Sequence, residues 1–455
     1  MRKLLIGGCV LTVLAAAVSA SASTSVQLIR NINSSGDARI GQVTNANGKV
    51  FFFADDGLHG TELWKSDGTA PGTVLVKDIK PGPHGLNANF LTNVDGTVFF
   101  SANDGVHGKE LWKSDGTSAG TVMVKDITPS GNSIFRSLTN VGGTLFFNLY
   151  DAVHGRELWK SDGTASGTVL VKDINPSGDS DPLQLMDRNG TLIFSARDGV
   201  NGRELWKSDG TASGTVMVKD IRPGSGSSAP EDLTLSAGTV FFSAKDGVHG
   251  LALWKSDGTE QGTVLVKDIN RYSDSFANYI TSITDVAGTV FFRANDGGGN
   301  QLWKSDGTEP GTVLVMGIGS CHFDATLNRT ECPGNPSRLT NVSGTLFFVG
   351  ADEELWKSDG TWPGTVLVKD INTGGISGPF ELTDVNGTLF FTANDGTHGN
   401  ELWQSDGTSR GTVMVKDINS TAGSSPFNLV NANRTLFFGA NDGVTGVELW
   451  TATST

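Results

Sequence analysis

The chain has 455 residues, and its 48 acidic residues outnumber 34 basic ones, so the formal net charge at pH 7 is −14. An acidic chain without basic runs excludes nucleic acid and anionic membrane surfaces from the expected partners. The 60 glycines recur at fixed places along the chain, which indicates repeated turns rather than disorder.

The chain begins with the features of a secretory signal peptide. A short basic start is followed by an apolar run over residues 4–18 and by the small residues 19–22. We therefore expect a signal peptide over 1–22, cleaved after Ala20 or Ala22, and a protein that is secreted, extracellular or at the cell surface, or periplasmic in a bacterium. Its removal leaves 32 basic and 48 acidic residues, a net charge of −16. No later segment is long and apolar enough to predict a transmembrane helix.

One motif, Glu-Leu-Trp-Lys-Ser-Asp-Gly-Thr at residues 62–69, organises the rest of the sequence. Its Leu-Trp core occurs nine times, at intervals of 47–53 residues. A fixed period of about this size is typical of solenoids, propellers and repeat arrays. The motif tryptophans, which we expect to form the buried core of each repeat, are Trp64, Trp112, Trp159, Trp206, Trp254, Trp303, Trp356, Trp403 and Trp450.

Each unit predicts four short antiparallel strands. In the second unit, β-branched and aromatic runs are separated by 95–96, by the loop 103–108 and by the turn 114–117. The Asp-Gly pair at 95–96 predicts a type I′ hairpin, and eight of the nine units place Gly second in this pair. Adjacent Phe99 and Phe100 would point to opposite faces of the sheet, which predicts sheets covered on both sides, as in propeller blades.

The two ends of the chain predict a closed ring. Residues 25–32 match the fourth strand of a unit, such as 73–79, whereas the chain stops just after the third strand of the last unit, at Trp450. Pairing of these segments would complete the last sheet and remove both open edges, and an open solenoid would instead show polar capping repeats. We predict an all-β, closed β-propeller of nine four-stranded blades over 23–455, with an eight-bladed ring as the alternative.

The repeated Glu-Leu-Trp-Lys-Ser-Asp-Gly-Thr-x-x-Gly-Thr resembles the ELWxxDGT repeat family of bacterial secreted and surface proteins, over essentially the whole mature chain. Eight units carry the Ser-Asp-Gly-Thr turn, and the last unit departs at 451–453. The resemblance implies secretion and a repeat fold rather than an activity. The turn is also similar to the Asp-box of sialidase propellers, a Ser-x-Asp-x-Gly hairpin between the third and fourth strands. That box is structural, so it implies no catalytic residue.

On a propeller, the loops between second and third strands share one face with the links between blades, and we expect binding on this variable face. It carries histidines at equivalent positions, with Asn201 in the fourth unit; we interpret them as loop-shaping rather than metal ligands, and they are His59, His107, His154, His249 and His398. The Asp-rich loops lack the spacing of a calcium loop, so we predict no metal or other cofactor, with calcium as the alternative. Polar residues near the ends of the first strands are interpreted as supports of the next turn: Asn45, Asn93, Asn140, Asp187, Asp285, Asn341, Asp384 and Asn431.

Breaks in the repeat are the candidate binding sites. An insertion over 319–336 holds Cys321 and Cys332, the two cysteines left in the mature chain, which we expect to form one disulfide. The next unit shortens its loop to 350–354, and Trp362 lies in a turn of the opposite face, where an aromatic ring can stack on a sugar. The residues predicted to bind a ligand are Trp362, His322, Phe323, Asp352 and Glu353.

The prominent polar residues are repeated many times, whereas an enzyme needs one unique set of acid, base or nucleophile. A sialidase-like site would need an arginine cluster, and no arginine lies in an obvious motif. We therefore predict a secreted, non-enzymatic scaffold that binds glycan or protein at the cell surface. The alternatives are a propeller hydrolase or lyase acting on polysaccharide, and a purely structural envelope component; the sequence predicts no oligomeric state.

Overall fold

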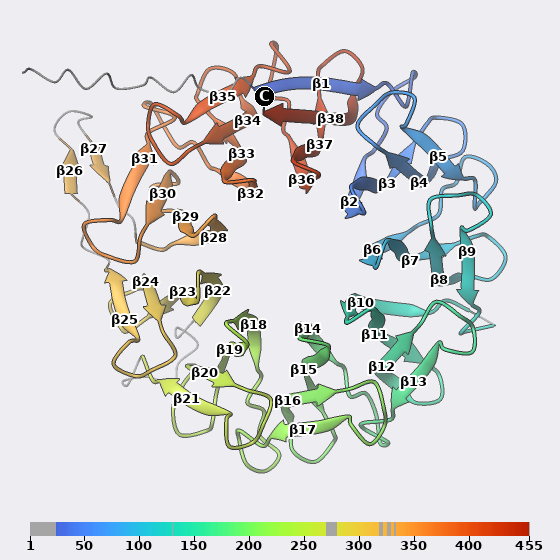
Figure 1. Cartoon of the computed structure of the whole chain (residues 1–455), viewed down its shortest axis with the longest axis vertical. Coiled ribbons are helices and arrows are strands. Elements are labelled where there is room, and N and C mark those ends of the chain that lie inside the picture. Colours follow the sequence, from blue (N-terminus) through green and yellow to red (C-terminus); the bar gives the residue numbers. More distant parts are fainter. Residues whose placement is uncertain are drawn as a thin grey trace, which may run out of the picture.

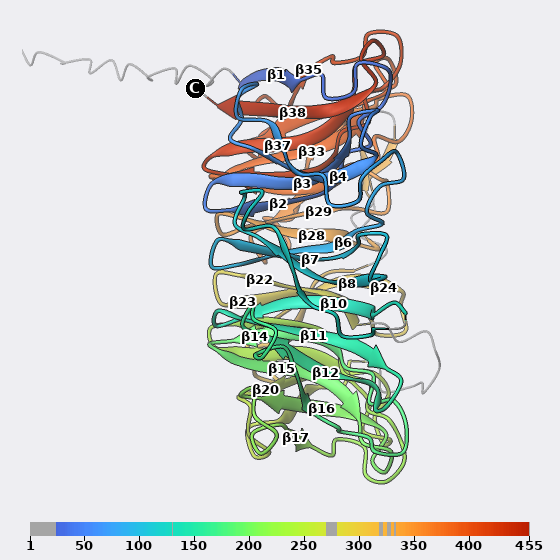
Figure 2. The same ribbon diagram turned by 90° about the vertical axis from the view of Figure 1, so that its right-hand side faces the viewer.

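The computed structural model describes residues 24–129, 131–269, 280–317, 322–324, 329–331 and 334–454. These residues form nine four-stranded antiparallel sheets arranged as a ring, and no helix occurs among them (Figure 1). Figure 2 shows the resulting disc edge-on, with the strands running across its thickness. The prediction of a closed nine-bladed β-propeller is confirmed, and the eight-bladed alternative is wrong.

Within a blade the first strand lies innermost and the fourth outermost (Figure 1). Blades 1 to 4 consist of β2 (Gly41–Ala46), β3 (Lys49–Asp55), β4 (Thr61–Ser66), β5 (Val74–Lys77); β6 (Asn89–Val94), β7 (Thr97–Asn103), β8 (Lys109–Ser114), β9 (Val122–Lys125); β10 (Ile134–Val141), β11 (Thr144–Asp151), β12 (Gly155–Ser161), β13 (Val169–Lys172); and β14 (Leu183–Arg188), β15 (Thr191–Arg197), β16 (Arg203–Ser208), β17 (Val216–Lys219).

Blades 5 to 8 repeat the same order. They consist of β18 (Glu231–Ser236), β19 (Thr239–Ala244), β20 (Ala252–Ser256), β21 (Val264–Lys267); β22 (Ile280–Val286), β23 (Thr289–Asn295), β24 (Asn300–Ser305), β25 (Val313–Met316); β28 (Ser337–Val342), β29 (Thr345–Val349), β30 (Leu355–Ser358), β31 (Val366–Lys369); and β32 (Phe380–Val385), β33 (Thr388–Asn394), β34 (Asn400–Ser405), β35 (Val413–Lys416). Between blades 6 and 7, β26 (His322–Asp324) and β27 (Arg329–Glu331) form a separate hairpin.

Blade 9 is assembled from both ends of the described chain. It contains β36 (Phe427–Ala432), β37 (Thr435–Asn441), β38 (Val447–Ser454) and, as its outermost strand, β1 (Thr24–Arg30). Leu28 pairs with Trp450 across β1 and β38. The predicted ring closure is therefore confirmed, and it removes the open sheet edges that an array would leave.

The hairpins between first and second strands have the predicted backbone. Asp95 and Gly96 both have positive φ, +49° and +91°. In blade 9 the non-glycine pair Asn433 and Arg434 adopts the same conformation, at +50° and +67°. The first-strand polar residues support these turns as expected, because Asn93 Oδ1 accepts a hydrogen bond from Gly96 N at 2.8 Å.

The Ser-Asp-Gly-Thr-x-x-Gly-Thr motif encodes one hydrogen-bonded turn between third and fourth strands. Asp67 Oδ1 accepts bonds from the backbone N of Thr69 at 2.9 Å and from its hydroxyl at 2.7 Å. Buried Ser66 and Thr73 share a hydroxyl–hydroxyl bond of 2.7 Å. A Cβ on Gly72 would lie 2.0 Å from the Asp67 carboxylate, so only glycine fits there. Each repeated residue type of the turn thus has a local structural task.

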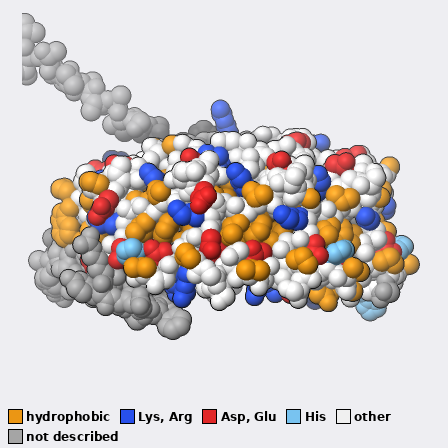
Figure 3. Space-filling model, turned by 90° about the horizontal axis from the view of Figure 1, so that it is seen from below, with side chains coloured by type: hydrophobic (Ala, Val, Ile, Leu, Met, Phe, Trp, Pro, Cys, Tyr) orange, Lys and Arg blue, Asp and Glu red, His pale blue; other side chains and the backbone are white. Residues whose placement is uncertain are grey.

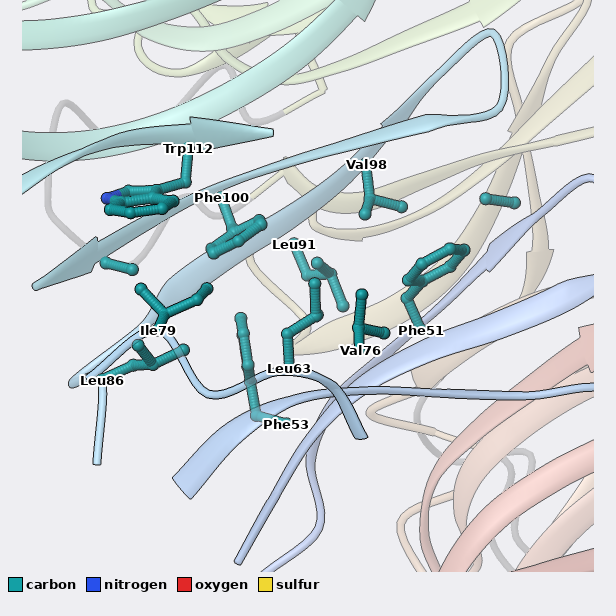
Figure 4. Packing of buried hydrophobic residues seen from close by; sticks show 12 residues of the cluster. Phe51, Phe53, Leu63, Val76, Ile79, Leu86, Leu91, Val98, Phe100 and Trp112 are labelled. Carbon is teal, nitrogen blue, oxygen red and sulfur yellow. The ribbon is translucent and has the colours of Figure 1, made fainter. Parts of the chain in front are cut away.

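The core is divided among the interfaces between blades. Phe51 and Phe53 of blade 1 pack against Phe100 and Trp112 of blade 2 (Figure 4). Phe99, adjacent to Phe100 in the chain, packs instead in the cluster shared with blade 3. All nine motif tryptophans are buried, as predicted. Each sheet therefore buries both faces against its neighbours, which a single blade cannot do alone.

In seven of the nine blades, the motif glutamate ties the blade to the link that follows it. Glu62 is fully buried, and its carboxylate accepts bonds from Ile79 N at 2.9 Å and Lys80 N at 3.2 Å. Burial raises the pKa of Glu62 to about 8. Blades 5 and 6 carry Ala252 and Gln301 at this position.

A basic side chain on the fourth strand joins most blades to the next one, whereas blade 6 has Met316 at this position. Lys77 Nζ donates to the carbonyl oxygen of Thr121 in blade 2 at 2.8 Å. Arg30 makes the same contact at the point of closure, to Thr73 O at 2.8 Å. The bond recurs at Lys125, Lys172, Lys219, Lys267 and Lys369. The N-terminal strand thus takes over both the pairing and the inter-blade contact of a fourth strand.

We expect Trp206→Ala to lower the free energy of unfolding by roughly 3–5 kcal/mol, because the cavity opens in a packed interface. Trp206 is 6% exposed and packs with Phe146 and Leu158 of blade 3. Trp362→Ala is the control, since this ring is 55% exposed. Denaturant melts of both variants measure the difference, and equal losses would contradict the assignment of the motif tryptophans to the core.

Candidate anion-binding site

We call the side of the disc that carries the second-to-third-strand loops and the inter-blade links the loop face, and the opposite side the hairpin face. On the loop face, the Asp56 carboxylate accepts bonds from Leu58 N and His59 N, each at 2.9 Å. Its other oxygen lies 2.8 Å from His59 Nδ1. The same arrangement recurs at His107, His154, His249 and His398. The histidines therefore shape their own loops, as predicted.

Charge reinforces this loop geometry. The hydrogen bond to Asp56 raises the pKa of His59 above its ordinary value. Burial opposes ionisation of Asp56, but the bonds from His59 and Leu58 outweigh it and hold the pKa of Asp56 below its ordinary value. Figure 3 shows histidine side chains near one face of the disc with acidic side chains beside them. Asn201 substitutes for histidine in blade 4, donating to Asp198 at 2.8 Å.

The residue that ends the second strand differs in three consecutive blades. In blades 1, 2, 6, 8 and 9 it is Asp or Asn, and its Oδ1 accepts a bond from the glycine two residues later, as at Asn103, where the bond is 2.7 Å. Blades 3, 4 and 5 have Tyr150, Arg197 and Lys245 at this position, and blade 7 has a shortened loop. The side chains in blades 3, 4 and 5 have no Asn-type oxygen for the turn.

Four arginines surround one aspartate between blades 3 and 4. Asp181 lies in the link that leads into β14, and its carboxylate is within 2.6 Å of Arg136, 3.0 Å of Arg203 and 3.3 Å of Arg197. Arg156 lies 3.9 Å away. Arg136 belongs to the innermost strand β10, whereas Arg156 and Arg203 lie at the starts of third strands, so the cluster runs outward across the loop face. We call these five residues the arginine cluster.

Two of the arginines are fixed by further bonds. Arg203 Nη1 donates to the backbone oxygen of Asp181 at 2.8 Å, and the backbone N of Asp181 donates to Arg156 O at 3.0 Å. Arg156 Nη1 lies 3.3 Å from both Ile134 O and Asn148 Oδ1. The side chains of Arg156 and Arg203 are only 11% and 14% exposed. They form the rigid base of the cluster.

The other two arginines face solvent. The side chains of Arg136 and Arg197 are each 49% exposed, and each donates one hydrogen bond to the Asp181 carboxylate. The pKa of Arg203 is lowered by burial and by the nearby charges of Arg197 and Arg136. Four cations around one carboxylate leave a local positive excess on an otherwise acidic protein. Such a site is suited to an anion.

The residues predicted to bind from repeat breaks lie elsewhere. Asp352 accepts a bond from the indole N of Trp356 at 3.0 Å, and Glu353 is exposed beside it, with φ of +59°. Trp362 is exposed on the hairpin face of blade 7. Their roles in binding stay predictions.

The other predicted features of the insertion are partly outside the described chain. His322 and Phe323 lie in β26, whose backbone pairs with β27, and only that backbone is described. Cys321, Cys332 and the predicted signal peptide fall outside the described residues.

The sequence pattern does not single out the arginine cluster, because its arginines come from four different strands and no motif groups them. Arg136 and Arg197 are 61 positions apart in the printed sequence and meet only when blades 3 and 4 pack. One feature of the sequence does mark the site, since Tyr150 and Arg197 replace the turn-supporting Asn or Asp. These replacements change the residue type without changing the length of the repeat.

The solved structures that resemble this chain do so at low identity. No protein-family model and no curated protein matches the chain. The computationally designed Ika8 protein has 17% identity and a TM-score of 0.45, over 83% of this chain and 99% of that chain. Puromycin hydrolase has 14% identity and a TM-score of 0.39, over 80% and 60%, and a prolyl endopeptidase 10% and 0.43, over 80% and 55%. The chain thus spans little more than half of these two enzymes, and likenesses at this level carry no argument about activity.

The described residues contain neither a three-ligand metal cluster nor a membrane-spanning helix. Within that part of the chain, no three His, Cys, Asp or Glu side chains converge as a metal site. No helix there has the length and apolar character needed to cross a bilayer.

Proposed function

We propose that this protein is a secreted, non-enzymatic β-propeller that binds an acidic glycan at a cell surface through the arginine cluster. The observation that carries this proposal is that four arginines share the single carboxylate of Asp181 on the loop face. A guanidinium presents five N–H donors in a planar fork that matches carboxylate and sulfate groups. Arg136 and Arg197 supply this fork at the surface. The expected signal peptide and the resemblance of the motif to bacterial surface proteins support the location.

The overall charge of −14 repels polyanions at long range. Binding therefore depends on short contacts at the cluster, where the buried Arg156 and Arg203 hold positive charge close to the surface. Because the exposed arginines are screened by salt, we expect affinity to fall as ionic strength rises.

We expect the mature protein to bind immobilised polygalacturonate or heparin and to leave neutral dextran unbound. Arg136→Gln and Arg197→Gln should each weaken binding roughly tenfold, because each removes a charge-assisted contact. Arg410→Gln is the matched control, since it removes the same charge from an exposed residue of a hairpin-face turn. Surface plasmon resonance of the variants measures these differences.

Two outcomes would contradict the proposal. One is failure of the protein to bind any acidic glycan at low salt. The other is an equal loss of affinity in the Arg410 variant, which would assign binding to general charge rather than to the cluster. Melting temperatures of all variants establish that they are folded.

A further inference from the structure

We propose that the acidic glycan is a polymer of uronic acid, whose pyranose rings stack on Tyr150 while their carboxylates bind the arginine cluster. This inference rests on the proposed function and names its ligand class. It starts from apolar side chains that adjoin the cluster on both blades.

On blade 3 a row of three side chains runs across the sheet. Tyr150 pairs with Ile134 across β10 and β11, and with Arg156 across β11 and β12. Directly opposed residues of neighbouring antiparallel strands project from the same face of the sheet. The Arg156 guanidinium carbon lies 5.8 Å from the centre of the Tyr150 ring. The row therefore joins an aromatic ring directly to the base of the cluster.

The apolar part of this row is open to solvent. Tyr150 is 39% exposed and Ile134 is 49% exposed. The Arg156 guanidinium lies beside part of the tyrosine, and part of the side chain stays open to solvent. Blade 3 thus has a partly exposed tyrosine where blade 2 has the turn-supporting Asn103. A ligand that stacks on the ring explains this exchange.

Blade 4 supplies a second apolar side chain across the cluster. Leu183 pairs with Ser195 across β14 and β15 and is 36% exposed. Arg203 Nη1 lies 3.3 Å from the carbonyl oxygen of Ser195, so Leu183 adjoins the other side of the cluster. Apolar, cationic and apolar surfaces thus follow one another from blade 3 to blade 4, which suits a chain of sugars better than a single one.

The chemistry of uronic acids fits this sequence of surfaces. Their carboxylate is attached directly to a ring carbon, so each sugar offers an apolar ring face and an anion within one residue. The C–H face of a pyranose packs on an aromatic ring, and the carboxylate meets the guanidinium fork. A poly-glutamate chain offers the carboxylates without the rings, and a sulfated glycan carries its anions on ester oxygens outside the ring.

The test compares the affinities of the mature protein for galacturonate oligomers of one, three and six units, for dextran sulfate and for poly-glutamate. We expect affinity to rise with oligomer length and to exceed that for dextran sulfate, which carries sulfate esters and no uronic acid. Tyr150→Ala should weaken oligogalacturonate binding roughly tenfold and leave poly-glutamate binding unchanged. Tyr150→Phe should bind as the wild type does, because it keeps the ring. Phe380→Ala, which removes an aromatic ring of 48% exposure from blade 8, is the matched control and should change nothing.

The outcomes separate this inference from the proposed function. If Tyr150→Ala binds uronates normally while Arg136→Gln does not, the cluster still binds acidic glycans but the stacking inference is wrong. A preference for dextran sulfate that Tyr150→Ala leaves unchanged leads to the same conclusion. If no acidic glycan binds, the proposed function itself is overturned.

Discussion

Deletion of residues 26–32 is expected to open the ring and to lower the free energy of unfolding by about 5 kcal/mol or more. The deletion removes most of β1 with its buried Ile29, and also buried Ile32 beyond the strand, and loss of buried aliphatic side chains costs about 2–5 kcal/mol each. It also exposes the edge of β38 and leaves the buried carboxylate of Glu448 without the bonds from Ile32 N and Asn33 N. Thermal unfolding and limited proteolysis measure the effect.

A synthetic peptide spanning residues 24–33 provides the control for this deletion. Added in excess, it should occupy the open edge of blade 9 and raise the melting temperature of the truncated protein, because binding to the folded state stabilises it. A peptide of the same composition in scrambled order should have no effect. Unchanged melting of the truncated protein would contradict the view that β1 closes the ring.

The protein is expected to melt at a lower temperature at pH 8.5 than at pH 5.5. Burial raises the pKa of Glu62 to about 8 and those of Glu204, Glu354 and Glu448 to about 7, from an ordinary value of 4.5. A carboxyl with a raised pKa in the folded state stabilises the fold fully below its unfolded pKa, and this contribution is lost as pH rises through the folded pKa. Stability should therefore decline from about pH 5 to above pH 8.

The loop histidines also make the fold less stable as pH rises. The hydrogen bond to its aspartate raises the pKa of each, as at His59, so their contribution is also lost as pH rises through the raised value. Aspartates such as Asp56 act at the other end, because their pKa is lowered and their contribution is lost only as pH falls through that lowered value. Maximal stability is expected in mildly acidic solution.

Glu62→Gln tests the origin of this pH dependence. Blade 6 already carries Gln301, buried, at the equivalent position, so the fold accommodates the amide. We expect the variant to show a smaller difference in melting temperature between pH 5.5 and pH 8.5 than the wild type, whatever its absolute stability. A melting temperature that rises from pH 5.5 to 8.5 in the wild type would show that the buried glutamates are not the controlling groups.

Most of the fold could be predicted because its determinants are local and repeated. The Asp95-Gly96 pair sets a hairpin through its own φ angles, and Asp67 and Thr69 build their turn within a few residues. Ring closure required one comparison, that of residues 25–32 with a fourth strand. Arg30 occupies the position of the lysines in other fourth strands and makes the same contact with the next blade. Its partner, Thr73 O, could not be named from the sequence.

The candidate site could not be predicted in the same way. Asp181 collects arginines from four strands of two blades, and no spacing along the chain encodes that meeting. Asp352 was predicted to bind a ligand because it lies in a shortened loop. In the structure its carboxylate accepts a hydrogen bond from the Trp356 indole. A residue that has the same local role in every repeat can be recognised from the sequence. A site that forms once, where two blades pack together, cannot.

Blade 9 combines strands from both ends of the chain, so it can be completed only late in folding. The other eight sheets are continuous in sequence and can form as soon as their own hairpins are available. The pairing of Leu28 with Trp450 has to wait until nearly the whole chain is present. Until then the molecule is an arc with two unpaired strand edges, the state in which edge-to-edge association with other chains competes with folding. The arrival of β38 therefore decides how long a newly made chain is exposed to this competition.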